Sequence, residues 1–304
     1  MAQETRHTPW DSNKITEEYF QRILLETRYL DAVTPNLSVD LFGKSFATPV
    51  MTAALSHLKG KDGDGMVQMA QGAAQAGALT WVGMSTSEQY EAIAKTGAPL
   101  VRIIKPYEAE KEFLSSLEQA EDLGAVAVGM DIDHSFNGQG QPDNVLGMPM
   151  RPRTFQEIES YCKRTSLPFV VKGVLSAQDA QKCLDAGAGG ILVSHHHGIM
   201  ASAVPALMVL PEILKVVKGR IPVFVDGSFE NGVDVFKALA LGADGVCVGR
   251  VLMSPIQEQG AEGCCQMIQT ISGELAAAMA RTCSPDPRHI DPSVLWIDGK
   301  RFSV

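Results

Sequence analysis

The stretch that decides the fold, residues 190–198, reads GILVSHHHG and predicts a short buried strand that ends in three imidazoles. Three similar stretches accompany it, namely FVVKG at 169–173, VFVDGS at 223–228 and GVCVGR at 245–250. In each, a continuous apolar run stops at a polar or glycine-containing corner. Such runs are typical of strands buried on both faces of a parallel sheet. Because the carboxyl ends of successive parallel strands meet in space, we expect one functional site there.

Short apolar runs of this kind recur through most of the chain, several of them after a segment that ends in Gly-Ala. Gly-Ala pairs at 77–78, 124–125, 187–188 and 242–243 each precede a short apolar run, and glycine accepts the left-handed conformation that ends a helix. These boundaries predict eight strands, near 48–53, 79–84, 100–104, 125–131, 168–172, 190–194, 222–226 and 245–249. Eight βα units without a break in composition predict an α/β fold, a single (β/α)8 TIM barrel that occupies residues 1–304 as one domain.

Two segments lie outside the repeating units. Residues 1–45 precede the first strand, and we expect an N-terminal helical extension there, with a helix near 16–26 that covers the bottom or flank of the barrel. The longest connection, 133–153, follows the fourth strand and includes NGQGQPD at 137–143. A loop of this length at the catalytic end is commonly a lid, and a tolerated surface insertion is the alternative.

Composition narrows the class of protein. The chain has 304 residues, of which 45% are hydrophobic and 20% charged, and a net charge of −9 without a run of Lys or Arg. This composition is typical of a globular protein and argues against a nucleic-acid partner. No apolar stretch approaches the roughly 20 residues of a membrane span, and the first residues lack a signal core. We expect a cytoplasmic protein with a small-molecule substrate, no membrane partner and reduced cysteines.

Polar residues at the strand ends suggest particular chemistry. Gly249 lets the backbone approach a ligand, and Arg250 offers a forked cation; with Asp226-Gly227-Ser228 they predict a phosphate site. A structural turn with a surface arginine is the alternative. Lys172 could be a Schiff-base nucleophile, a charge partner for a cofactor, or a side chain that reaches to solvent.

The three histidines allow two interpretations. A metal site needs a further ligand group that the sequence does not show, so we expect no metal and a structural role for at least two of the three. One imidazole beside a carboxylate suits a general base, since its pKa lies near working pH. Asp131 and Asp133, which end the fourth strand, are its natural partners.

Taken together, these motifs resemble the FMN-dependent α-hydroxy-acid dehydrogenases and oxidases, a family that includes glycolate oxidase and lactate oxidase. The stretches that carry the resemblance are VKGVLSAQDA at 171–180, GILVSHH at 190–196, DG at 226–227, DVFKALALGA at 234–243 and VGR at 248–250. The resemblance is strongest over 165–255 and fainter but collinear over 17–131. It implies FMN as cofactor, an oxidoreductase acting on CH–OH groups, and a homo-oligomer, often a tetramer.

The resemblance also assigns roles to single residues. His196 takes the place of the catalytic base. Asp131 takes the place of the carboxylate that stabilises the charged imidazole, and Lys172 takes the place of the cation beside the flavin N1/C2 carbonyl. The other matches are expected cofactor contacts. They are Ser194 at the flavin, Ala54, Leu55 and Ser56 beside N5, Asp226, Gly227, Ser228, Gly249 and Arg250 toward the ribityl chain and phosphate, and Arg102 on the third strand.

This chain departs from the family pattern at several positions. Ile199 stands where the family has the arginine that holds the substrate carboxylate, and Ile104 where it has a substrate tyrosine. Glu230 stands where the family has an arginine for the phosphate, after the seventh strand. The family has a further arginine in the loop after the fourth strand, and Arg151 or Arg153 could take its place only by analogy. Losing a bidentate charged contact typically removes a few kcal/mol of binding. We therefore expect a substrate bulkier or less acidic than lactate.

Three functions are consistent with these residues. The first is an FMN oxidoreductase in which His196 accepts a proton while hydride passes to flavin N5. The second is an FMN-dependent isomerase similar to the type II isopentenyl-diphosphate isomerases. The third is a flavin-free barrel, either an aldolase-type lyase that uses Lys172 or a phosphate-binding protein without catalysis.

Overall fold

The computed structural model describes residues 10–303 and shows a closed parallel barrel. Its strands are β4 (Val50–Thr52), β5 (Thr80–Val82), β6 (Leu100–Ile104), β7 (Ala127–Asp131), β10 (Phe169–Val174), β11 (Gly190–Val193), β12 (Val223–Val225) and β13 (Gly245–Val248). They pair in the order β4-β13-β12-β11-β10-β7-β6-β5. Gly83 N donates to Leu55 O at 3.0 Å and closes the ring between β5 and β4. The predicted (β/α)8 barrel is confirmed, with each strand where the apolar runs placed it.

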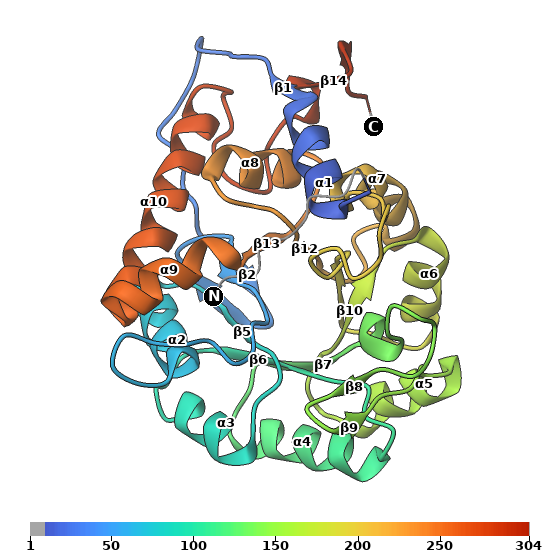
Figure 1. Cartoon of the computed structure of the whole chain (residues 1–304). Coiled ribbons are helices and arrows are strands. Elements are labelled where there is room, and N and C mark those ends of the chain that lie inside the picture. The colour runs from blue at the N-terminus through green and yellow to red at the C-terminus, as the bar shows by residue number, and fades with distance from the viewer. Residues whose placement is uncertain (1–9, 304) are drawn as a thin grey trace.

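An outer ring of helices surrounds these strands (Figure 1). Its members are α2 (Gly65–Gln75), α3 (Ser87–Ala94), α4 (Glu110–Asp122), α5 (Phe155–Arg164), α6 (Ala177–Asp185), α7 (Ala206–Val217), α8 (Gly232–Ala240), α9 (Arg250–Gln259) and α10 (Ala261–Ala280). After α2, α4, α6 and α8, the predicted glycine adopts a positive φ, for example 67° at Gly77 and 107° at Gly242. An L residue with a side chain rarely adopts this conformation, so these glycines end the helices as expected. Among the described residues, no helix is both long and apolar enough to cross a bilayer.

The barrel interior is a packed apolar core that is polar only at one end. Inward side chains such as Trp81, Ile103 and Phe224 form one buried cluster. The hairpin of β2 (Val39–Leu41) and β3 (Lys44–Phe46) contributes to the same cluster, so it closes the amino-terminal end of the strands. Strand side chains alternate between faces. The next inward positions, two residues further along each strand, are Ala53, Gly83, Lys105, Asp131, Lys172, Ser194, Asp226 and Gly249.

The N-terminal extension differs from its prediction in the extent of its helix. Helix α1 spans Ser12–Gln21, and the chain then forms β1 (Ile23–Leu25), which pairs with β14 (Leu295–Ile297) in a sheet completed by β15 (Lys300–Arg301). The helix expected as far as residue 26 is therefore wrong, because the strand partner lies at the far end of the chain. Helix α1 contacts the loop after β11 at its start and α8 at its end, where Lys237 Nζ donates to Phe20 O at 3.0 Å, so it lies along the flank of the barrel as expected. Residues 1–9 of the extension lie outside the described residues.

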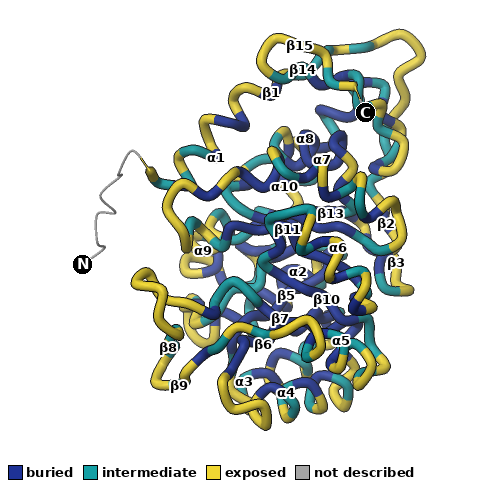
Figure 2. Tube along the Cα trace, turned by 90° about the vertical axis from the view of Figure 1, so that its right-hand side faces the viewer, coloured by how far each residue is buried: buried dark blue, intermediate teal, exposed yellow. Residues whose placement is uncertain are grey.

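The long loop after β7 is folded. It contains the short helix η1 (Ile132–Ser135) and an exposed hairpin of β8 (Asn144–Val145) and β9 (Met148–Pro149), at the lower left of Figure 2. Met150 is buried and bridges to Tyr107 after β6, which ties the base of the hairpin to the barrel. The loop therefore stands at the catalytic end, and its movement as a lid stays a prediction.

Candidate active site

A cavity of about 650 Å³ opens at the carboxyl ends of the strands. This volume lies within the range that is common for small-molecule and cofactor sites. The residues that line it come from nearly every strand end: Ala53–His57, Met84, Lys105, His134, Val145, Lys172, His196, His197, Asp226–Glu230, Cys247, Gly249, Arg250 and Met253. The structure thus brings His196, Lys172 and Arg250 to one mouth, together with Ala54, Leu55, Ser56, Asp226, Gly227, Ser228 and Gly249, as the sequence predicted.

A buried carboxylate, Asp131, organises the polar end of this cavity. Its Oδ2 lies 2.6 Å from Lys105 Nζ, and its Oδ1 lies 3.1 Å from Lys172 Nζ. Burial alone would raise the pKa of Asp131, but Lys172, His196 and Lys105 outweigh burial and hold this pKa well below its usual range. Burial would likewise lower the pKa of Lys172, yet Asp131, Asp133 and Asp226 raise it overall. The site therefore holds a carboxylate anion between two lysines.

The ring of His196 is held at one nitrogen. Its Nδ1 lies 2.8 Å from Asp133 Oδ1, 3.2 Å from Asp131 Oδ1 and 3.1 Å from Lys172 Nζ. Burial and Lys172 lower the pKa of His196, but Asp131 and Asp133 outweigh them, so the pKa is raised. Two carboxylates beside Nδ1 place the proton of the neutral ring on that nitrogen, which leaves Nε2 to accept a proton.

Asp133 is the nearer of the two carboxylates, although the resemblance pointed to Asp131. Asp133 Oδ2 is buried and finds no hydrogen-bond partner among the described residues. Burial, the largest effect, raises the pKa of Asp133. Gly173, with φ of +94°, leaves the space that Asp133 occupies, because a Cβ there would lie 2.6 Å from Asp133 Cγ.

The neighbouring histidines have other partners. His195 is buried; its Nδ1 accepts from Gly198 N at 3.0 Å and its Nε2 lies 3.0 Å from Thr16 Oγ1. His197 Nδ1 lies 2.9 Å from Asn13 Oδ1. These contacts join the loop after β11 to α1, in agreement with a structural role for two of the three histidines.

The opposite end of the cavity fits a phosphate ester. Gly249 is the N-cap residue of α9 and no side chain caps the helix, while Arg250 Nη2 lies 2.8 Å from Ser228 Oγ. A helix N-terminus and a guanidinium together favour a bound anion. Asp226 Oδ1 is buried without a hydrogen-bond partner among the described residues, which suits it to accept from a ribityl hydroxyl. The residues present thus fit FMN, although Glu230 lines the same cavity and adds negative charge.

Two expectations on β6 are wrong by one position. Arg102 faces the outer helices, where its guanidinium donates to Ser116 O and Gln119 Oε1 and stacks 3.9 Å over the Tyr90 ring. Ile104 packs in the same outer layer. A slip of one residue along a strand moves a side chain to the opposite face. Lys105, which the sequence interpretation missed, occupies the inward position at the cavity; counting by two from Ile103 would have found it.

Three further residues that the sequence singled out are not among those that line the cavity. Ser194 is buried, and its hydroxyl accepts from His196 N at 3.0 Å, so it supports the catalytic loop. Arg151 and Arg153 both pair with Glu157 on α5, and Arg153 also donates to Tyr107 O. Neither arginine is available as a substitute for the missing loop arginine, because both are held at the base of the hairpin.

The arrangement also includes a possible set of metal ligands. One ligand atom from each of Asp131, Asp133 and His196 lies within 4.8 Å of the others. However, the ammonium groups of Lys105 and Lys172 already neutralise Asp131. We therefore interpret the cluster as an ion-pair network that controls a proton.

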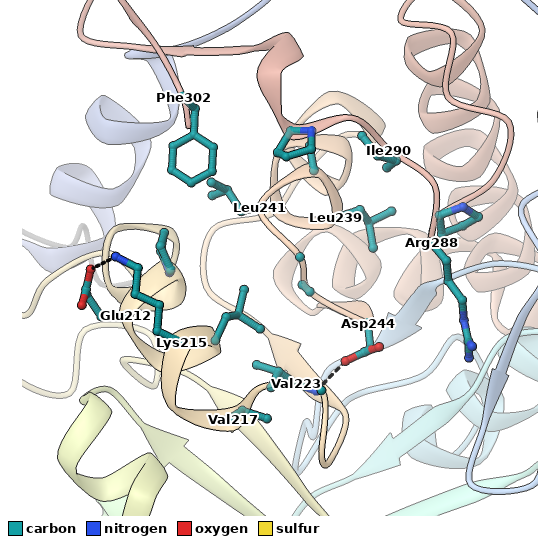
Figure 3. Close-up of a pocket in the computed structure, with 18 of the residues that line it drawn as sticks. Glu212, Lys215, Val217, Val223, Leu239, Leu241, Asp244, Arg288, Ile290 and Phe302 are labelled. Carbon is teal, nitrogen blue, oxygen red and sulfur yellow. Dashed lines mark hydrogen bonds and ion pairs between the residues drawn. The ribbon is translucent and has the colours of Figure 1, made fainter. Parts of the chain in front are cut away.

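A second cavity, of about 730 Å³, lies between α7, α8 and the C-terminal segment (Figure 3). Several of its polar groups are already paired: Asp244 accepts from Val223 N at 2.8 Å, and Lys215 binds Glu212 at 2.9 Å. Val223 begins β12, whereas Asp226 follows its end, so this cavity lies at the opposite end of the strand. Among the described residues, its walls contain no histidine or cysteine.

Comparison with known proteins agrees with this geometry. The profile of the FMN-dependent dehydrogenase family matches residues 11–158 and 144–297. Glycolate oxidase 3 of Arabidopsis thaliana is 31% identical, over 86% of this chain and 81% of the relative. The 4-hydroxymandelate oxidase of Amycolatopsis orientalis is 30% identical, over 85% and 82%.

Solved structures lead to the same family. Mandelate oxidase with (S)-2-phenylpropionate is similar with a TM-score of 0.86 at 29% identity, covering 95% of this chain and 91% of that one. A mandelate oxidase variant with the C4a-OH-FMN adduct gives a TM-score of 0.85. The resemblance found in the strand-end motifs is confirmed: the chain belongs to the FMN-dependent dehydrogenase family, with FMN as its cofactor and a CH–OH group as the group oxidised.

Proposed function

We propose that this protein oxidises a 2-hydroxy acid to the 2-oxo acid, with His196 as the general base. The observation that carries the proposal is the imidazole of His196, whose Nδ1 is fixed by Asp133 at 2.8 Å while its ring lines the cavity. FMN, when bound, supplies the hydride acceptor at N5. A base with a pKa near working pH contributes about 10²- to 10⁴-fold to such a step.

The charges of the site support proton transfer to His196 Nε2. When the ring takes the proton of the substrate hydroxyl, the positive charge forms beside Asp131 and Asp133. Both carboxylates are already in place, so this stabilisation needs no rearrangement. The raised pKa of His196 has the same origin.

Lys172 supports an oxidoreductase better than a lyase. A Schiff-base nucleophile must lose its proton, whereas Asp131, Asp133 and Asp226 raise the pKa of Lys172 and keep it an ammonium. Its buried positive charge suits a position beside a ring that gains negative charge on reduction. This argument disfavours the aldolase-type alternative.

The cavity walls favour a substrate with an apolar side chain. Leu55, Met84, Val145 and Met253 line the cavity. Mandelate and 4-hydroxymandelate, which are substrates named for relatives, combine an aromatic ring with a 2-hydroxy acid. We therefore propose an aromatic or branched 2-hydroxy acid, bulkier than lactate.

Anaerobic reduction of the flavin tests the proposal. Purified protein should be yellow, and a panel of hydroxy acids that includes mandelate should bleach it in single turnover. His196→Gln should stay yellow and bleach at least about 100-fold more slowly. A flavin that no hydroxy acid reduces would favour the isomerase alternative, and a protein that does not bind FMN would refute both.

Two properties stay proposals with simple tests. A cytoplasmic location is checked by cell fractionation, and a homo-oligomer by light scattering of the purified holoenzyme. A monomer at micromolar concentration would contradict the second.

A further inference from the structure

Lys105 is a buried cation that the sequence interpretation did not place at this site. It follows β6 on the inward face, its side chain is 8% exposed, and it lines the cavity with His196 and Lys172. Its Nζ has three N–H donors, and Asp131 Oδ2 at 2.6 Å is the one acceptor that the described residues provide. The remaining N–H groups of Lys105 are therefore available to donate hydrogen bonds to a ligand in the cavity.

The other permanent cations of the cavity already have roles. Arg250 lies with Ser228 at the phosphate end, and Lys172 contacts both Asp131 and His196. Among the residues that line the cavity, Lys105 is the remaining lysine or arginine. Arg151 and Arg153 are held by Glu157, outside the cavity.

The burial of Lys105 also favours an anion beside its ammonium group. Lys105 and Lys172 share the single carboxylate of Asp131, whereas Asp133 is directed at His196. Burial, the largest effect, lowers the pKa of Lys105 in spite of Asp131. A second anion beside Nζ would stabilise the charged form, since a buried charge needs pairing.

We propose that Lys105 Nζ binds the substrate carboxylate and replaces the arginine that Ile199 removes from this chain. This inference rests on the proposed function, because it assigns a place to the carboxylate of the same 2-hydroxy acid. It moves the carboxylate contact from the loop after β11 to the end of β6. Specificity for an acid over an alcohol then depends on one lysine.

Equilibrium binding to the oxidised holoenzyme tests this role without turnover. Benzoate and benzyl alcohol, which differ in the carboxylate, are titrated by the change in flavin absorbance. Lys105→Gln should raise the Kd of benzoate about 10- to 100-fold, as expected for a lost hydrogen bond to a charged group, and should change that of benzyl alcohol less than about twofold. Lys105→Arg should keep most of the affinity, and Lys182→Gln, at an exposed lysine of α6, should match the wild type.

Steady-state kinetics provide the second readout. Lys105→Gln should raise KM for a hydroxy acid more than it lowers kcat, since the contact exists before the reaction. The proposal is overturned if benzoate binds Lys105→Gln as well as it binds the wild type, or if both probes weaken equally. If Lys105→Gln does not retain FMN, the two probes are compared on the wild type alone. Equal affinity of the wild type for benzoate and benzyl alcohol then overturns the proposal. Failure of the proposed function is distinct, because it appears as a wild-type flavin that binds benzoate but is not reduced by any hydroxy acid.

Discussion

Replacing Asp133 by asparagine should change the pH at which this enzyme loses activity. Asp133 Oδ1 lies 2.8 Å from His196 Nδ1, closer than Asp131 Oδ1 at 3.2 Å. His196 must be neutral to accept a proton, so activity falls as pH falls through its pKa. Because the two carboxylates raise that pKa, the acid limb of the wild type should lie above the usual histidine value of about 6.5.

The magnitude follows from the partners that remain. An opposite charge within about 4–6 Å shifts a pKa by roughly 1–3 units. Asp131 stays in contact after the substitution but is shared with Lys105 and Lys172. We therefore expect Asp133→Asn to lower the pKa of His196 by about one unit, which is about 1.4 kcal/mol of differential stabilisation. The maximal rate should fall as well, because an amide holds the imidazolium less well than a carboxylate.

The assay is the pH profile of kcat/KM from about pH 5 to pH 9, the range over which histidine titrates. Asp143→Asn is the matched control, since it removes a carboxylate that contacts His134 at 2.9 Å instead of His196. Its acid limb should move much less than that of Asp133→Asn. An acid limb that stays in place, or moves to higher pH, in Asp133→Asn would refute the assignment of Asp133.

Further substitutions test the cofactor end of the site and its support. Arg250→Met should raise the Kd of FMN about 10- to 100-fold. Glu230→Gln should lower the Kd of FMN severalfold, and this effect should shrink at high salt. Both Kd values are measured by flavin fluorescence on the apoprotein, and unchanged values would contradict the phosphate site. Gly227→Ala should lower Tm, because φ is +105° and a Cβ would lie 2.9 Å from His195 Nε2. Thr16→Val should cost about 1 kcal/mol of unfolding free energy in chemical denaturation while kcat stays the same, since the Thr16 hydroxyl contacts Ser12 O and the structural His195. A kcat that falls would show that His195 acts in the reaction.

Much of the fold follows from local patterns of the sequence. Continuous apolar runs identify the buried strands, and a glycine that must take a positive φ marks each helix end, for example Gly77 and Gly242. Both signals depend on residues close together in the chain. His196, Lys172 and Arg250 could be assigned to one site because each follows such a strand, and the ends of parallel strands meet.

The sequence alone determined the barrel, the FMN cofactor, and the convergence of His196, Lys172 and Arg250 on one cavity. Which face Arg102, Ile104 and Lys105 occupy depends on strand register, and a slip of one residue reverses it. The pairing of Lys105 with Asp131 joins residues 26 positions apart, and that of β1 with β14 joins opposite ends of the chain. Only the tertiary structure decided these contacts, because no local periodicity records a distance between segments that meet after folding.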